Sequence, residues 1–147
     1  YIRIEIDHRN IINQLRSLRM ELDFDKRLAM IIPGGRIDYG TMKQVCQSED
    51  DEELIELLRR SNAFDGEGFE TALEQSKAIL SLDPFAELLS HQRQRILRKF
   101  AYLSPVSPFP IIYYIERKSL EVRNLRLLVR GKAIGLDDKV LESHMDF

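Results

Sequence analysis

Apolar residues recur along this chain at spacings of three, four and seven, which collect side chains on one face of a helix. In the first segment this pattern runs from Ile4 to Leu22 and predicts a long amphipathic helix. Asp23 or Asp25 can then begin a shorter helix that runs to about Ile32.

Proline and glycine divide the remaining sequence into further helical segments. The Pro-Gly-Gly sequence at 33–35 predicts a turn, because proline removes a backbone donor and glycine permits positive φ. A loop is expected between Asn62 and Gly68. Asp83 followed by Pro84 is typical of the start of a helix. We expect helices over about 39–47, from 49 onward, over 69–80, from 84 to the prolines at 105, 108 and 110, over 109–130, and from 136 toward 145.

The last long segment carries its apolar residues on one stripe. They are Ile111, Ile115, Val122, Leu125 and Val129. No sustained period-two alternation with β-branched residues occurs anywhere in the sequence. The pattern therefore predicts an all-α fold.

The chain also matches itself at one offset, since Asn124 lies 114 residues after Asn10. In each copy a basic residue precedes an acid by four positions, and an asparagine follows the acid by three, so the three side chains share a helix face. The superposed groups are Arg3, Asp7 and Asn10 with Arg117, Glu121 and Asn124. We predict pseudo-repeated helical hairpins over approximately 1–32 and 115–146, within a single domain that covers 1–147.

The repeated polar cluster has three interpretations. It can be an exposed salt bridge beside a solvated asparagine, or a ligand site. The interpretation we prefer is structural: the acid and the amide bond to a neighbouring helix or loop and fix how the repeats dock, because buried polar groups find partners.

Composition places the chain among proteins that fold in water. Apolar residues make up 44% and charged residues 31% of 147 residues, enough for one core without a membrane span. Cys46 is the single cysteine, so no internal disulfide can form, which favours a cytoplasmic location. The first ten residues do not resemble a signal peptide. Tyr1 already lies on a helical pattern, so we expect a piece of a longer protein.

The sequence shows no pattern typical of an enzyme, a cofactor site or a metal site. The three histidines, His8, His91 and His144, are scattered without a cluster of metal-ligand spacing. The turn at 33–35 lacks the Lys-Ser/Thr of a phosphate-binding loop, and the acids at 49–53 are better explained as a solvated helix start than as a cation site. Lone Cys46 is expected to be a small core residue.

Charge argues against nucleic acid as a general partner, because the net charge is −2. The later helices are nevertheless basic. Their cationic side chains are Arg93, Arg95, Arg98, Lys99, Arg117, Lys118, Arg123, Arg126, Arg130 and Lys132. Such a patch can touch nucleic acid or anionic headgroups, but aromatic residues for base stacking do not alternate with it.

One stretch resembles the C-terminal signature of a known family. Its residues are Glu121, Val122, Arg123, Asn124, Leu125 and Arg126, followed by Gly131 and Lys132. An earlier acid-x-x-Asn-Ile motif at 7–11 is followed by the turn at 33–35. Both features resemble the C subunit of the A- and V-type rotary ATPases, whose eukaryotic vacuolar relative is the d subunit. The resemblance spans nearly the whole chain, which looks like less than half of the family's full-length protein.

The resemblance implies a non-catalytic part of a funnel-like helical bundle on the cytoplasmic face of the membrane. Such a protein links the central stalk to the membrane rotor ring and transmits torque for ATP-coupled proton or sodium transport. It implies no cofactor, no nucleic acid, and membrane association through the ring only. We expect Arg126 and Arg130 to face acidic partner helices or polar loops of the ring. The alternative is a helical-repeat module, unrelated to ATPases, that binds protein or nucleic acid.

Overall fold

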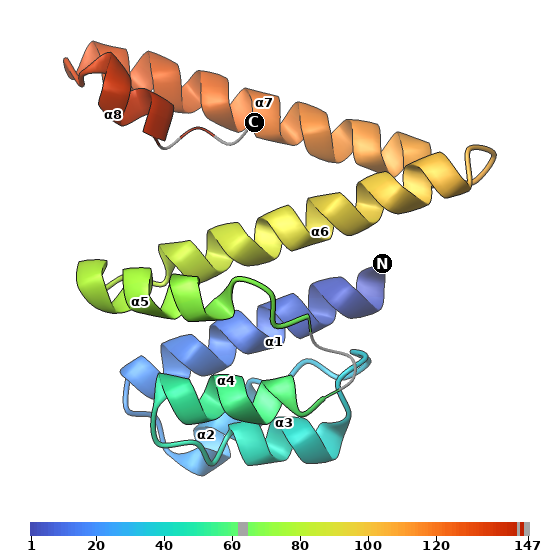
Figure 1. The fold of residues 1–147 in the computed structure, drawn as a ribbon, viewed down its shortest axis with the longest axis vertical. Coiled ribbons are helices and arrows are strands. Elements are labelled where there is room, and N and C mark those ends of the chain that lie inside the picture. The colour runs from blue at the N-terminus through green and yellow to red at the C-terminus, as the bar shows by residue number, and fades with distance from the viewer. Residues whose placement is uncertain (62–64, 144, 146–147) are drawn as a thin grey trace. The chain divides into compact units, whose positions relative to one another are not determined.

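The computed structural model describes residues 1–61, 65–143 and 145, and regular structure within them is helical (Figure 1). The all-α prediction is confirmed. The helices are α1 (Ile2–Arg19), α2 (Phe24–Ala29), α3 (Tyr39–Val45), α4 (Asp51–Arg59), α5 (Phe69–Ile79), α6 (Asp83–Leu103), α7 (Phe109–Ala133) and α8 (Asp138–Ser143). Asn62, His144 and Asp146, which the sequence predictions include, lie outside the described residues.

Contacts divide the chain into two compact units, which cover 1–93 and 94–147. The prediction of one domain for the whole chain stays a prediction.

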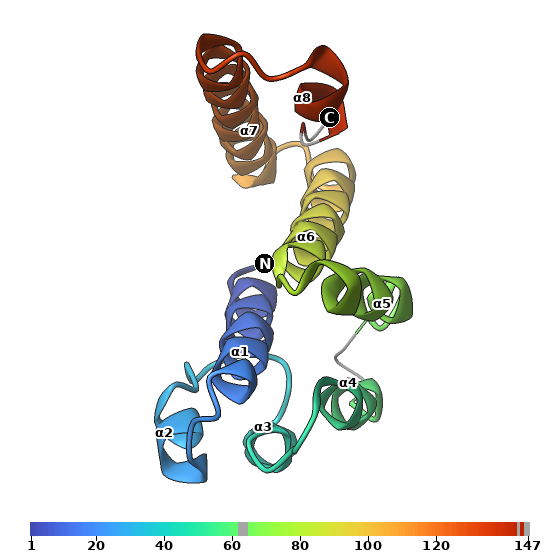
Figure 2. The same ribbon diagram turned by 90° about the vertical axis from the view of Figure 1, so that its left-hand side faces the viewer.

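The first unit is built around α1. In both views α2, α3 and α4 lie along one side of α1 (Figures 1 and 2). Ile11 and Leu15 of α1 are 1% and 0% exposed and belong to one hydrophobic cluster with residues of α3, α4, α5 and α6. The other members are Ile37, Met42, Val45, Leu54, Ile55, Leu58, Phe69, Ala72, Phe85 and Leu89. Cys46 is also buried.

Side-chain acceptors begin two of these helices. The Thr41 N–H donates to the Asp38 carboxylate at the start of α3, at 2.9 Å. At the start of α4 the Glu53 N–H donates to Asp50 at 2.7 Å, and the Glu53 carboxylate accepts the Glu49 N–H at 2.8 Å. These bonds satisfy first-turn N–H groups that have no partner within the helix.

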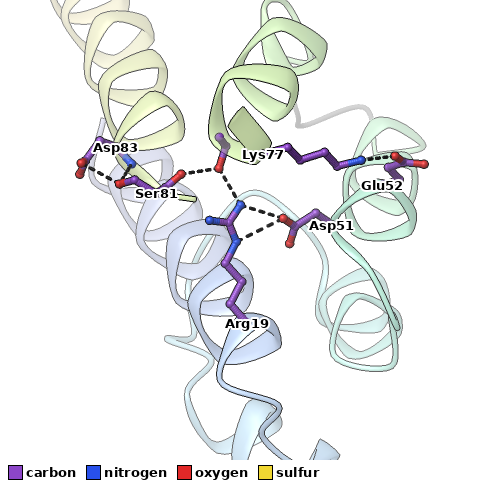
Figure 3. A network of polar contacts seen from close by, with 7 residues as sticks. Arg19, Asp51, Glu52, Lys77, Ser81 and Asp83 are labelled. Carbon is purple, nitrogen blue, oxygen red and sulfur yellow. Dashed lines mark hydrogen bonds and ion pairs between the residues drawn. The ribbon is translucent and has the colours of Figure 1, made fainter. Parts of the chain in front are cut away.

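A polar network joins the C-terminal end of α1 to α4 and α5 (Figure 3). The Arg19 guanidinium lies 2.9 Å from the Asp51 carboxylate and donates to the Ser76 hydroxyl at 2.6 Å. Ser76 in turn donates to the Ser81 carbonyl, and Lys77 pairs with Glu52. The prediction of a merely solvated helix start is therefore wrong for Asp51, whose side chain is only 14% exposed.

The second unit contains the end of α6, then α7 and α8. Leu97, Leu120 and Leu141 are buried, and the rings of Phe100 and Phe109 stack at 5.2 Å across the α6–α7 connection. Buried positions in the 25-residue helix α7 are Leu120 and Gly131.

Some predicted helix positions are wrong. Leu22 lies beyond the end of α1, because Glu21 adopts a φ of 52° that stops the helix. Leu80 ends α5 with a φ of 54° and is exposed. Pro110 does not terminate a helix but lies in the first turn of α7, where its missing N–H is not needed.

The apolar stripe of α7 is the largest departure from what its pattern suggests. Apolar stripes ordinarily face a core. The five residues at 111, 115, 122, 125 and 129 are instead all more than half exposed. The buried positions of α7 lie on its other side.

Candidate interaction surface

Asp7 and Asn10 share one face of α1 and hold the turn that follows α2. The Asn10 amide donates to the Ile32 carbonyl at 2.9 Å and accepts the Ile32 N–H at 2.8 Å. The Asp7 carboxylate accepts the N–H groups of Arg36 and Ile37, at 3.0 and 3.3 Å. Both side chains are buried. They therefore attach the returning chain to the first long helix.

The glycines of this turn allow the chain to approach Asp7. Gly34 has a φ of 97°, a conformation that residues with a Cβ rarely adopt. A Cβ at Gly35 would lie 2.0 Å from Asp7 Oδ1. The Pro-Gly-Gly sequence is thus required by the position of the carboxylate as well as by the turn.

The pKa of Asp7 is raised above its ordinary value in this environment. Burial raises the pKa of Asp7, and the backbone N–H groups of Arg36 and Ile37 oppose that effect without cancelling it. Arg3, which the spacing places one helical turn from Asp7, is exposed. The carboxylate therefore finds its partners in the backbone of the turn.

Arg27 is a buried cation that sequence reasoning missed. Its guanidinium donates to the carbonyls of Ser48 and Val45, at 2.7 and 2.9 Å. The Gln14 side-chain amide donates to the Arg27 carbonyl at 2.9 Å. Arg27 thereby joins α1, α2 and the link between α3 and α4. A basic residue in the last turn of a short helix is usually solvated, so the sequence carries no signal of this burial.

Glu5 connects α1 to α6. The Glu5 carboxylate lies 2.7 Å from the Arg93 guanidinium and 3.1 Å from that of Arg9. Burial raises the pKa of Glu5, but these two cations outweigh it and hold the pKa below its ordinary value. Burial, aided by Arg93, lowers the pKa of His8 to about 4, so His8 is neutral at physiological pH.

The helix limits of the second hairpin match those of the first at the offset of 114. α7 ends at Ala133, and α8 covers Asp138–Ser143, each 114 residues after the matching limits of α1 and α2. The Leu22 N–H donates to the Ser17 carbonyl at 3.0 Å, and the Leu136 N–H donates to the Gly131 carbonyl at 2.9 Å. The helix-ending bonds of one copy thus recur in the other.

The buried contact between the two helices of the second hairpin is apolar. Leu141 stands at the position that Arg27 occupies in the first copy, and Gly131 stands at the position of Ser17. A Cβ at Gly131 would lie 2.2 Å from Leu141 Cδ2. Gly131 therefore lets Leu141 pack directly on the backbone of α7.

The second polar cluster is more open than the first. Glu121 lies 2.6 Å from Lys118 and is about half exposed, while Arg117 is exposed. Glu121 and Asn124 line a hollow of about 410 Å³, together with Tyr114, Arg117, Lys118, Leu120, Leu125 and Met145. The position that corresponds to Ile32 is 146, which lies outside the described residues. Glu121 thus pairs with Lys118 rather than with Arg117.

A model of the ATP synthase (C/AC39) subunit family matches residues 1–144. The chain belongs to this family. The C subunit of the A-type ATP synthase of Haloferax volcanii is 32% identical over 146 residues, which are 99% of this chain and 40% of the relative. The same protein of Methanosarcina barkeri is 28% identical over 145 residues, which are 98% of this chain and 38% of the relative.

The chain spans about 40% of the length of the curated relatives that it matches. No solved structure matches it significantly. Membership of the C/AC39 family nevertheless argues against a helical-repeat module unrelated to ATPases.

The remaining charged residues of the predicted signature, and the predicted partner contact Arg130, lie on α7 of this C/AC39 chain and are accessible. Arg123, Arg126, Arg130 and Lys132 are exposed, and Lys132 pairs with Asp138 of α8. In the part of the chain that the structure describes, no helix has both the length and the apolar character to cross a bilayer. Across the same residues no three His, Cys, Asp or Glu side chains gather into a group that could hold a metal ion.

Proposed function

We propose that this chain is part of a non-catalytic coupling subunit of an A/V-type rotary ATPase. In this role the subunit links the central stalk to the membrane rotor ring at the cytoplasmic face. It transmits torque for ATP-coupled proton or sodium transport, and the nucleotide chemistry takes place in other subunits. The observation that carries the proposal is the family match over residues 1–144.

The hydrogen bonds of the first hairpin support a mechanical role. Torque passes through a protein only if its elements do not slide past one another, and close-packed interiors have low compressibility. Asp7 and Asn10 fix the turn at 32–37 to α1 by part-buried bonds, and buried bonds of Arg27 join Gln14 of α1 to Val45 of α3. Such directional bonds further fix how the helices are oriented about their axes.

The test is a pull-down of the full-length subunit with central stalk proteins and with the detergent-solubilised ring. We expect the subunit to retain both. Loss of either interaction would reject the linking role.

Coupling can be tested separately from binding. In the assembled enzyme, a double substitution of Asp7 and Asn10 by alanine should leave assembly intact and lower the number of ions moved per ATP hydrolysed. Asn13→Ala, on the same helix, is the matched control. An unchanged ratio in the double variant would show that these bonds are not needed for torque transmission.

We further propose that Arg126 and Arg130 contact acidic groups of the stalk or ring. Both are exposed on α7, where six basic and two acidic side chains give a positive surface. Charge reversal of both residues should weaken retention of one partner. The binding that is left should depend less on salt concentration. Retention equal to that of the unmodified subunit would remove this assignment.

A further inference from the structure

The exposed stripe of α7 consists of five apolar side chains, Ile111, Ile115, Val122, Leu125 and Val129. Their exposed fractions run from 52% at Val122 to 67% at Val129. A row of exposed apolar side chains on one helix face is typical of an interaction site. The helix packs onto α8 through Gly131, so this stripe is not used by the contact within the hairpin.

The first hairpin shows what kind of element covers this face. At the offset of 114, Leu125 and Val129 correspond to Ile11 and Leu15 of α1. Those two residues are buried in the cluster that contains Leu54, Ile55 and Leu58 of α4. In the first unit this face is therefore covered by a cluster in which α4, a short amphipathic helix that contacts α1, takes part beside α3, α5 and α6.

The charges on the two surfaces are complementary. α4 carries four acidic side chains, at 51, 52, 53 and 56, and one basic side chain. Asp51 of α4 pairs with Arg19 at the end of α1. On α7, Lys118, Arg126 and Arg130 lie within one helical turn of stripe residues. A second copy of α7 would bring like charges together, whereas an acidic helix would neutralise them.

We propose that the α7 stripe is a docking face for an amphipathic helix whose apolar side is bordered by acidic residues, packed as α4 packs on α1. The partner is thereby defined by its chemistry. The inference goes beyond the coupling role and does not depend on it.

A peptide of residues 48–60 is a suitable probe, because it contains all of α4 and the acids before it. A hydrocarbon link between positions 56 and 60, both exposed on α4, keeps it helical. Titrated as a fluorescent ligand into the whole chain, it should bind saturably. Affinity should fall at least tenfold when Asp51, Glu52 and Glu53 of the peptide are replaced by lysine.

Substitutions in the chain locate the binding face. The double variant Leu125→Asp with Val129→Asp should weaken binding at least tenfold, and circular dichroism should show unchanged helix content because both positions are exposed. Val106→Asp is the matched control, since Val106 is an apolar residue of the same unit that is 100% exposed. It should bind the peptide like the unmodified chain.

Several outcomes would overturn the proposal. These are absence of saturable binding, equal affinity for the lysine-substituted peptide, and equal affinity of the double variant. A dimer of the whole chain that the double variant abolishes in sedimentation equilibrium would assign the stripe to a second copy. Peptide binding that persists while the full-length protein fails to retain stalk and ring would reject the coupling role alone.

Discussion

At the scale of single residues, the first hairpin depends on side chains that can both donate and accept. The Asn10 amide satisfies the N–H and the C=O of Ile32 at once, which a carboxylate or a hydroxyl of fixed orientation cannot do in the same geometry. A buried backbone group without a partner is unfavourable. Asn10 therefore stabilises the fold chiefly by preventing two such groups from being left unsatisfied.

Asn10→Ala should lower the free energy of unfolding by about 1–3 kcal/mol, because Ile32 would lose both of its hydrogen bonds in a partly buried setting. Urea denaturation followed by circular dichroism measures this change. Asn13→Ala, one turn along the same helix and half-buried, should change the free energy of unfolding by less than about 0.5 kcal/mol. Equal effects of the two substitutions would contradict the role given to Asn10.

His8 makes the stability of the chain depend on pH. Its pKa falls from 6.5 to about 4 on folding, so between these values the unfolded chain binds a proton that the folded chain does not. Stability should therefore decrease as the pH falls from about 6.5 toward 4. Denaturation at pH 7, 6 and 5 should show a smaller decrease for His8→Gln.

His91→Gln is the control for that experiment, since His91 is exposed on α6. It should keep the pH dependence of the unmodified chain. If the free energy of unfolding of His8→Gln changed with pH as steeply as that of the control, His8 would not be the group that titrates.

At the scale of elements, the two hairpins share their helix ends but differ in how the second helix is held. Residues 21 and 135 both have positive φ, at 52° and 76°, and both follow the last turn of a long helix. The first hairpin places the buried Arg27 on its short helix, while the second places the apolar Leu141 at that position. The two hairpins therefore share the backbone geometry of their helix ends, and this geometry is compatible with different side chains.

The shared helix end predicts opposite effects for two substitutions. Glu21→Gly should stabilise the chain by about 0.5–1 kcal/mol, because a left-handed conformation is unfavourable for a residue with a Cβ. Gly135→Ala should destabilise it by about 1 kcal/mol for the same reason, as a Cβ there meets no atom within 4 Å. Thermal denaturation of both variants measures the effects, and Glu21→Ala is the control. A destabilising Glu21→Gly would show that the Glu21 side chain matters more than its backbone.

At the scale of the whole molecule, the two compact units differ in their cores. The first unit contains a cluster of twelve buried apolar residues, and buried polar side chains link its helices. In the second unit the longest helix, α7, has buried positions only at Leu120 and Gly131. Local stability follows the number of buried contacts, so it should be uneven along the chain.

Hydrogen exchange should show this difference directly. Amides of the central turns of α1 and α4 should exchange more slowly than those between residues 111 and 118 of α7, because fewer buried side chains hold that part of α7 in place. Exchange followed by mass spectrometry gives the rates. In the presence of the stapled α4 peptide, protection should increase along α7 and stay unchanged in α1. Equal protection of α1 and α7 in the free chain would contradict the account of the two units.

Much of the architecture could be predicted from the sequence, for local physical reasons. The spacing of apolar residues, the Asp-Pro start of α6 and the glycines at 34 and 35 act over a few residues, so the all-α fold and most helix limits follow from them. The polar cluster that recurs at the offset of 114 could be found in the same way. The sequence could not show that Asp7 and Asn10 bind the backbone of 32–37, because their partners lie more than twenty positions away.

Tertiary structure alone decided which apolar and charged side chains are covered. The sequence determined that α1 and α7 each carry an apolar stripe, since periodicity is a property of one helix. Burial depends on what lies opposite that helix: Ile11 and Leu15 are buried in a cluster with residues of α3, α4, α5 and α6, whereas Leu125 and Val129 remain exposed. The burial of Arg27 arises in the same way, because the carbonyls that accept its N–H groups belong to Val45 and Ser48, 18 and 21 positions away in the sequence.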